Sequence, residues 1–386
     1  MKFKISLILI TLILTFNLSG NVELKNNIET IKNPNKPALG EISFKLKLDL
    51  SISGKKFDFY EINMIAIDNK ENIYALDQGN CCIFKFNKNG KYIMKIGRKG
   101  QGPGEFTYPS CIFIDDYQNI YVSDYNRRIH IFDKNGRFLK NIPLKYSIFD
   151  FFIDSENNII AVSRIATKAG PEKAILKFND KGEKIKEIVK FSDVKPAIRK
   201  SDKGTPFVLT VYHRYNYWPY LYPLGEGEFV YAYPKEYKIF IMNTDGDLKL
   251  IIEKEEVPQP INRKEKNFII KRIENRLKRR GRKFPRKMIE EACQFPRYRP
   301  FFKNILADDK GRIYVQKMKS VIDKSKEVEF DIFSKDGHYL YKTKFPFTPE
   351  IIRKGYVFNI YSSDETSETK IERYKIKNWS EIKVLF

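Results

Sequence analysis

The chain has 386 residues, of which 42% are hydrophobic and 14% aromatic, with only 20 glycines and 18 prolines. This composition suffices for a large packed core and excludes collagen-like, disordered and disulfide-scaffold proteins. The 71 Lys and Arg residues outnumber the 48 Asp and Glu residues, and a formal net charge of +23 raises the question of an acidic partner. Three histidines and four cysteines leave little material for a zinc site or for imidazole catalysis.

Residues 1–20 have the pattern of an export signal. Lys2 and Lys4 precede a run of twelve largely apolar residues, 5–16. Such a run is shorter than the roughly 20 residues needed to span a hydrocarbon core, which favours a removed signal peptide, cleaved near Gly20, over an uncleaved anchor. We therefore expect a protein exported to a periplasm or to the medium, with no transmembrane segment after signal removal.

One pair of strands recurs along the chain. The stretches IAIDNKENIYALD, IFIDDYQNIYVSD and FFIDSENNIIAVS surround Asp68, Asp115 and Asp154, and weaker copies surround Phe229 and Asp308. Each stretch alternates apolar and polar residues on both sides of a short polar turn, which is typical of a β-hairpin. Recurrence of this kind indicates a repeat architecture.

A second strand pair follows each hairpin and contains a glycine turn. Glycine adopts positive φ without strain, and the Asn or Asp before it tolerates the same geometry. Intervals of 46 residues between the first three turn glycines lengthen to 64 and 91 later, which indicates insertions rather than missing repeats. The turns lie at Gly90, Gly136, Gly182, Gly246 and Gly337.

A sixth unit extends from Gly355 through residues 370–376, with residues 377–380 in place of the glycine turn. Six four-stranded antiparallel sheets hide their edges by closing radially, so the sequence predicts an all-β, six-bladed β-propeller with a short helical insertion. Residues 41–51 alternate in polarity and are the candidate strand that closes the ring against the last blade. The expected domains are a signal peptide (1–20), an N-terminal linker (21–40) and the propeller (41–386).

The sequence that begins at Gly100 resembles an NHL-type repeat. It reads GQGPGEFTYP and continues with Asp115, with NIYV from Asn119 and with DYNRRI from Asp124. The chain is similar to the exported bacterial six-bladed β-propellers, most clearly over residues 60–140. This resemblance implies the fold but no single function, because NHL-type propellers include interaction modules, nucleic-acid binders and a lyase class.

The titratable residues do not form a recognisable catalytic or metal centre. His130, His213 and His338 are not at metal-ligand spacing, and the glycines around Pro103 precede a strand rather than the helix of a phosphate loop. We therefore expect no cofactor and interpret the glycines as a blade-to-blade loop, with calcium held by carboxylates in the central tunnel as an alternative. Cys81, Cys82, Cys111 and Cys293 leave open whether a disulfide forms.

Aromatic residues crowd positions 212–223. Exposed Tyr and Trp side chains suit stacking on sugars or capture of a peptide. We predict that Arg214, Tyr217 and Trp218 contribute to a surface over the ring that binds a protein, peptide or glycan. The alternative is that alternate aromatics form the inner strand of the fourth blade.

The long interval before Gly337 contains a basic helical insertion over about 256–300. Asn262 is a suitable helix cap, and Gly281 is a suitable end. A second short helix is expected from Pro285. Residues 262–300 contain 15 Lys and Arg against 4 Asp and Glu.

Such a basic helix suits an acidic partner, either an anionic membrane surface or an acidic glycan. A solvated face without a partner is the alternative, and the export signal argues against nucleic acid. The predicted basic partner surface comprises Lys278, Arg279, Arg280, Arg282 and Lys283. The sequence thus favours a non-enzymatic binding or scaffolding module that acts through its loop face. The alternative is a propeller hydrolase, lactonase or lyase with a carboxylate-bound metal in the tunnel.

Overall fold

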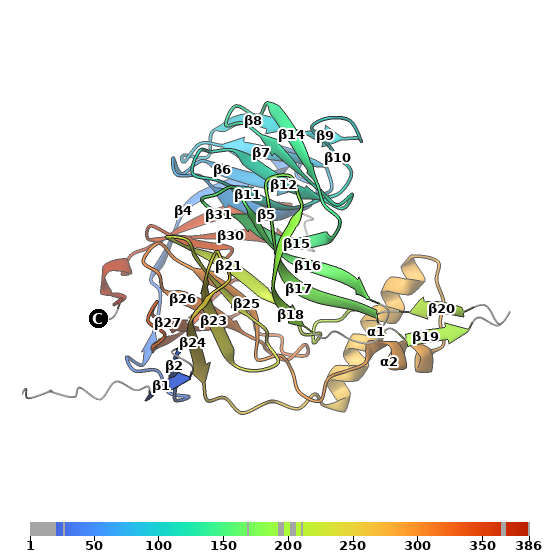
Figure 1. Ribbon diagram of the computed structural model, residues 1–386, viewed down its shortest axis with the longest axis vertical. Coiled ribbons are helices and arrows are strands. Elements are labelled where there is room, and N and C mark those ends of the chain that lie inside the picture. The colour runs from blue at the N-terminus through green and yellow to red at the C-terminus, as the bar shows by residue number, and fades with distance from the viewer. Residues whose placement is uncertain are drawn as a thin grey trace, which may run out of the picture.

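The computed structural model describes residues 21–25, 28–167, 170–191, 197–200, 206–209, 211–363 and 368–384. The signal peptide predicted for residues 1–20 lies outside these described residues. Six sheets with four or more strands follow one another along the chain, and we number them as blades 1 to 6 (Figure 1). No helix among the described residues is long and apolar enough to span a membrane.

The first three blades follow the regular spacing of the repeat. Blade 1 contains β5 (Ile62–Ile67), β6 (Ile73–Asp77), β7 (Cys82–Phe86) and β8 (Tyr92–Ile96). Blade 2 contains β11 (Pro109–Ile114), β12 (Ile120–Asp124), β13 (Arg128–Phe132) and β14 (Phe138–Pro143). Blade 3 contains β15 (Ser147–Ile153), β16 (Ile159–Thr167), β17 (Gly170–Phe178) and β18 (Lys184–Phe191).

The last three blades also recruit strands from the N-terminal segment. Blade 4 contains β21 (Tyr220–Gly225), β22 (Glu228–Ala232), β23 (Lys238–Asn243) and β24 (Leu248–Lys254). Blade 5 contains β25 (Phe302–Ala307), β26 (Ile313–Lys317), β27 (Val328–Phe333) and β28 (Tyr339–Phe345). Blade 6 contains β29 (Ile351–Arg353), β30 (Tyr356–Ser363), β31 (Glu368–Ile376) and, as its outer strand, β4 (Leu46–Ser53).

The blades form a closed ring. The first strand of each blade contacts the first strand of the next, from β5 through β11, β15, β21 and β25 to β29. Contact between β30 and β5 then joins blade 6 to blade 1. The six-bladed β-propeller predicted from the repeat is therefore confirmed, and apolar side chains from neighbouring blades pack together between the sheets.

The repeated aspartate of each hairpin shapes a turn. The carboxylate of Asp68 accepts hydrogen bonds from the backbone nitrogens of Lys70 (2.9 Å) and Asn72 (2.8 Å), and from the Tyr74 hydroxyl (3.1 Å). These bonds satisfy a tyrosine hydroxyl whose ring is fully buried. Backbone nitrogens donate in the same way to Asp115, Asp154 and Asp308, and a tyrosine hydroxyl also bonds Asp115 and Asp308. The most visible repeat of the sequence therefore has a structural role.

The five turn glycines adopt the predicted left-handed conformation. Their φ angles lie between 76° and 90°, a region that a side chain would strain. The glycine-rich sequence around Pro103 forms the loop between β8 and β11, as expected, and contains β9 (Arg98–Lys99) and β10 (Glu105–Phe106).

Residues 28–53 form an N-terminal belt along the outer edges of three blades. The strand β2 (Ile28–Asn33), preceded by β1 (Asn21–Lys25), pairs in parallel with β24 of blade 4. The two-residue strand β3 (Glu41–Ile42) pairs with β28 of blade 5, and β4 pairs antiparallel with β31 of blade 6. The predicted closing strand is thus confirmed from Leu46 onward, whereas residues 21–40 are not the expected linker, because they contain strands that extend blade 4.

The side chain of Asn33 ties the belt to the ring. Its amide nitrogen donates to the carbonyl oxygen of Gly337 (2.8 Å), and its amide oxygen accepts from the backbone nitrogen of Tyr339 (2.7 Å). Asn33 is buried, so these bonds compensate for its loss of water.

Two insertions interrupt the ring, one between blades 3 and 4 and one between blades 4 and 5. The first precedes β21 and contains the hairpin of β19 (Ala197–Lys200) and β20 (Pro206–Leu209). The second precedes β25 and contains α1 (Arg263–Arg279) and α2 (Arg286–Cys293), close to the predicted limits. Both project from one side of the ring (Figure 1). Short 3-10 turns, η1 (Gly54–Lys56) and η2 (Trp379–Glu381), follow β4 and β31.

Candidate functional site

Three segments gather at one end of the blades. The first insertion leads into Tyr220, which begins β21 and pairs with Ala232 at the end of β22. The second insertion leads into β25, whose first residue, Phe302, pairs with Lys317 at the end of β26. The third segment, residues 318–327, follows Lys317 directly. Each segment therefore emerges at the end where the inner strands begin, which we call the loop face.

An apolar cluster joins these segments into one body. Its buried members come from residues 211–215 of the first insertion and from α1 and α2 of the second, and residues 318–321 pack against it. Ile269, Ile270 and Ile273 supply the inner face of α1, and each is at most 5% exposed. The narrow apolar stripe of this otherwise charged helix therefore fixes its position on the loop face.

A buried carboxylate completes this anchor. Glu265 forms a capping box with Asn262 at the start of α1. It also accepts hydrogen bonds from the Tyr215 hydroxyl (2.5 Å) and from the Ser320 hydroxyl (2.6 Å), and it lies 3.7 Å from the Arg299 guanidinium. Although burial opposes ionisation, the hydroxyl bonds lower the pKa of Glu265 and keep it charged. One side chain thus connects all three segments.

His213 has a structural role beside this anchor. Its Nε2 lies 2.8 Å from the Cys293 carbonyl oxygen, and its Nδ1 accepts from the backbone nitrogen of Tyr215 (3.2 Å). Burial lowers the pKa of His213 to about 4, so the ring is neutral at physiological pH. Its interactions orient residues 211–215 and add no positive charge.

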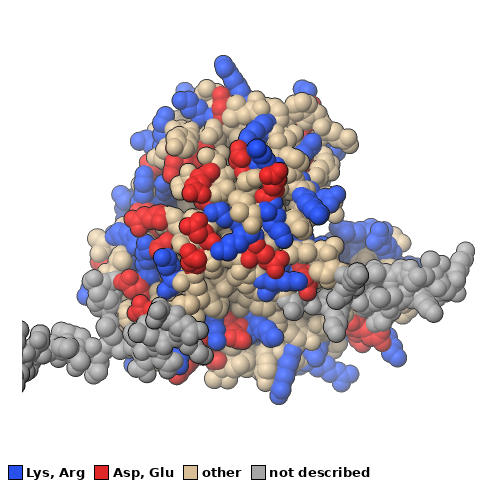
Figure 2. Space-filling view, viewed as in Figure 1, with Lys and Arg blue, Asp and Glu red and all other residues tan. Residues whose placement is uncertain are grey.

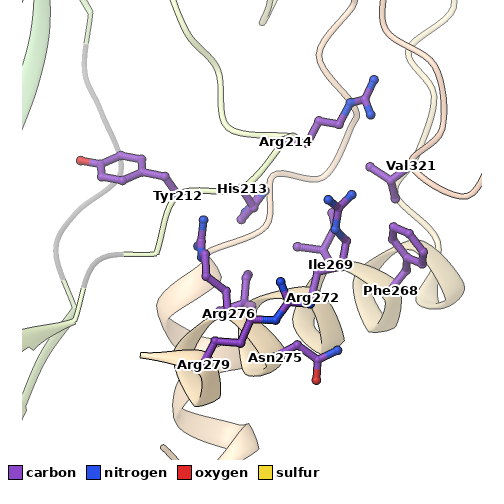
Figure 3. A pocket seen from close by; sticks show the side chains of 11 residues that line it. Tyr212, His213, Arg214, Phe268, Ile269, Arg272, Asn275, Arg276, Arg279 and Val321 are labelled. Atoms are coloured by element: carbon purple, nitrogen blue, oxygen red, sulfur yellow. The ribbon is translucent and has the colours of Figure 1, made fainter. Parts of the chain in front are cut away.

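Between α1 and residues 212–214 lies a cleft of about 700 Å³, which we call the basic cleft (Figure 3). Arg272, Arg276 and Arg279 line it from α1, and Arg214 lines it from the opposite side. The guanidinium groups of Arg272 and Arg276 point from the helix toward the 212–214 segment (Figure 3). The remaining lining residues are Tyr212, His213, Phe268, Ile269, Ile273, Asn275 and Val321.

The four cleft arginines form no ion pair with a carboxylate among the described residues. Within the described ranges, no residue that lines the cleft is acidic. Three carboxylates of the insertion pair with other arginines, Glu265 with Arg299, and Glu274 and Glu290 with Arg286. The charges therefore add up to a positive potential in a concave site, which attracts anions.

The wider surface supports this local asymmetry. Over the blades, Lys and Arg side chains are interspersed with Asp and Glu (Figure 2). The insertion that contains α1 instead carries 15 Lys and Arg against 4 Asp and Glu over residues 262–300.

The structure separates the three residues predicted to bind ligand. Arg214 lines the basic cleft. Tyr217 and Trp218 are half-buried and pack against blade residues instead: the Tyr217 ring meets Tyr233 at 5.9 Å, and Trp218 meets Phe149 edge to face at 4.9 Å. The Tyr217 hydroxyl also donates to the Tyr298 carbonyl oxygen of the second insertion (3.2 Å). The inner strand of blade 4 begins only at Tyr220, so both aromatics lie in the preceding loop.

The predicted basic surface occupies the C-terminal end of α1 and the following turn. Its five residues, Lys278, Arg279, Arg280, Arg282 and Lys283, are all exposed, and Arg279 alone among them lines the cleft.

Arg272 and Arg276 are the cleft residues that the sequence analysis missed. The available signal was their spacing with Arg279, because residues four and three apart share one helix face. A count of charge over the whole insertion does not resolve that face.

A second group of titratable side chains lies on the inner strands. Asp150 of β15 and Lys303 of β25 adjoin register shifts near the start of each strand, and β-bulges redirect side chains. Burial raises the pKa of Asp150 to about 7 and raises the pKa of Glu350, which precedes β29. Burial, aided by Arg214, lowers the pKa of Lys303 to about 8.

Within the described ranges, no three His, Cys, Asp or Glu side chains form a group that would hold a metal ion. The calcium alternative remains a prediction. All four cysteines are buried and free, which decides the question left open by the sequence.

Comparisons with known proteins agree with the architecture. Residues 53–238 match the DUF5128 family model, described as a 6-bladed beta-propeller. The crystal structure of a protein from Bacteroides fragilis NCTC 9343 that is predicted to be exported superposes with a TM-score of 0.55 and 14% identity, covering 90% of this chain and 99% of that chain. A DUF4221 family member from Bacteroides vulgatus ATCC 8482 gives a TM-score of 0.49 and 13% identity, covering 86% and 98%. No curated protein matches the chain.

The sheets, their closure and these comparisons define the class: the protein is a six-bladed β-propeller. At such low identities the structural likeness extends to the fold alone, so the function has to be argued from the loop face.

Proposed function

We propose that this protein is an exported, non-enzymatic binding module of the NHL-type propeller group, and that its loop face captures an anionic ligand in the basic cleft. One observation supports this proposal above the others: four arginines from two separate insertions line one cleft, and in the described part of the chain no ion pair joins them to a carboxylate. Export is inferred from the leader pattern of residues 1–20, and the predicted export of the Bacteroides fragilis neighbour agrees with it.

The anchor of α1 supports a binding role because it holds the arginines in place before a ligand arrives. Glu265 and the isoleucine stripe fix the helix, so its backbone does not have to be ordered on binding. A merely solvated charged face would not require a buried carboxylate that connects three segments.

Retention on immobilised heparin, a general polyanion, tests the proposal. The double variant Arg272→Ala/Arg276→Ala should elute at a clearly lower salt concentration than wild type, because each lost arginine removes a counter-charge at the site. The matched control is Lys264→Ala/Lys287→Ala, which removes two exposed cations of the same insertion that do not line the cleft. Equal elution of the two double variants would show that only net charge matters and would refute a cleft-specific site.

A further inference from the structure

The chemistry of the basic cleft narrows the class of ligand. All its cationic lining residues are arginines, although the surrounding insertion is also rich in lysine. A guanidinium presents a planar fork of donors that matches carboxylate and sulfate groups, and it stays charged at every physiological pH. The ligand groups that the cleft selects are therefore planar or multi-oxygen anions.

The arginines of α1 form a row rather than a single cradle. Arg272, Arg276 and Arg279 share one helix face, and the rise of an α-helix separates their Cα positions along the axis by about 6 Å and about 4.5 Å. Arg214 also lines the cleft, from the 212–214 segment across from α1, although its guanidinium points away from the helix (Figure 3). A row of charges at such intervals suits a chain that carries an anion on successive units, whereas a single phosphate would contact one part of it.

The cleft also offers apolar contacts beside the charges. Phe268 is 39% exposed at the rim, and Ile269, Ile273 and Val321 contribute to the lining. Aromatic rings with one accessible face suit the C–H faces of sugars. A volume of about 700 Å³ is in the range of ligand pockets and concave, which favours a narrow chain over a flat membrane surface.

Resting on the proposed function, we infer that the basic cleft binds an extended acidic polysaccharide, whose uronate carboxylates or sulfate groups pair with Arg214, Arg272, Arg276 and Arg279 while a sugar ring packs on Phe268. The helical insertion is thus a glycan-binding arm on the propeller, and the ring is its scaffold.

A length series tests this inference by calorimetry at constant ionic strength. Galacturonic acid and its dimer, tetramer and hexamer should bind progressively more tightly until the row of arginines is filled, and the gain should then level off. Heparin oligosaccharides of matched length, which carry sulfate groups in addition to uronate carboxylates, show whether sulfate strengthens binding. Inorganic phosphate, a single-stranded DNA oligomer and phosphatidylglycerol vesicles complete the panel.

Substitutions of single residues test which side chains of the cleft contact the oligosaccharide. Each of Arg272→Ala and Arg276→Ala should weaken hexamer binding about tenfold, the equivalent of one charge-assisted hydrogen bond. Phe268→Ala should weaken uronate and sulfate oligomers but not phosphate. Lys264→Ala/Lys287→Ala should bind like wild type, and thermal unfolding should confirm that every variant is folded.

Several outcomes would overturn the inference. If phosphate or the monomer binds as tightly as the hexamer, the cleft is a single-anion site, and the proposed function stands without the polysaccharide. Tighter binding of DNA or of vesicles would assign another class of partner. If no anion distinguishes the arginine variants from the lysine control, the inference and the proposed function both fail.

Discussion

Asp150 shows at the residue scale how the inner strands differ from the outer surface. Its carboxylate accepts a hydrogen bond from the backbone nitrogen of Phe151 (2.9 Å), and burial raises its pKa to about 7. An ordinary aspartate in the unfolded chain ionises near pH 4. Between these two values the unfolded state releases a proton that the folded state keeps, so this residue contributes less to stability as the pH rises.

Replacement of this carboxyl group should therefore flatten the pH dependence of stability. The contribution of Asp150 is fully present below about pH 4 and is lost as the pH rises through about 7. The melting temperature of wild type should fall more between pH 5 and pH 8 than that of Asp150→Asn. Asp180→Asn, which changes an exposed carboxylate, is the control. Parallel profiles for wild type and Asp150→Asn would contradict the raised pKa.

The site residues show what a single sequence reveals at this scale. Trp218 and Tyr217 drew attention as aromatics in an insertion, but aromatic character does not distinguish a ligand platform from packing against Phe149. Arg214 was predicted for a ligand surface and lines the cleft. Arg272 and Arg276 line the other wall of the cleft. Their place opposite residues 212–214 could not be predicted, because only tertiary packing around Glu265 brings α1 to that segment.

Some elements of this protein are determined by residues close together in the sequence, and others by pairing with residues far along the chain. The hairpins carry their own turn chemistry in Asp68 and its equivalents, so their strands were predictable from short stretches. The helix α1 was equally predictable from its local sequence, because Asn262 caps it and Glu265 completes the capping box. By contrast, β2 forms only a hairpin with β1 locally, and its attachment to the ring is a parallel pairing with β24, which lies far along the chain. That is why residues 21–40 were expected to be a linker.

The anchor of α1 makes a prediction at the element scale. Glu265→Ala removes the capping box and both hydroxyl bonds, and it leaves the Tyr215 hydroxyl and Arg299 without their carboxylate. We expect faster backbone amide exchange and earlier protease cleavage within residues 263–293, with the exchange of blades 1 to 3 unchanged. Glu290→Ala, which removes an exposed partner of Arg286, should leave both unchanged.

Equal protection of α1 in Glu265→Ala and wild type would show that the apolar cluster alone holds the helix. Cleavage throughout the propeller would show instead that the insertion and the ring unfold together.

The ring as a whole depends on one long-range pairing. The strand β4 completes blade 6, and the backbone nitrogen of Lys45 bonds the side-chain oxygen of Asn378 (2.9 Å), 333 residues away. Without β4, the edge of β31 would expose a row of unpaired backbone groups, which is a site for aggregation. The repeat predicted the number of blades, and the alternation of residues 41–51 predicted their closure, because both signals lie within short windows.

N-terminal truncation tests the role of β4 in closing the ring separately from the roles of the other belt strands. A chain that starts at residue 43 retains β4 and should stay folded and in solution, with a lower melting temperature because β2 and the bonds of Asn33 are lost. A chain that starts at residue 54 should aggregate or melt far earlier. Scanning calorimetry and size-exclusion chromatography, with the chain from residue 21 as reference, distinguish these results. Equal stability of the two truncated chains would contradict the role assigned to β4.

The belt also sets the order in which the molecule can be completed. During synthesis β4 emerges among the first strands, but its partner β31 emerges only with the last blade. Every growing intermediate therefore carries at least one unmatched belt strand and an open ring, and contacts of such large sequence separation form slowly. The ring can close only after blade 6 has been synthesised. A chain interrupted before that point therefore retains an exposed strand edge that chaperones and proteases can recognise.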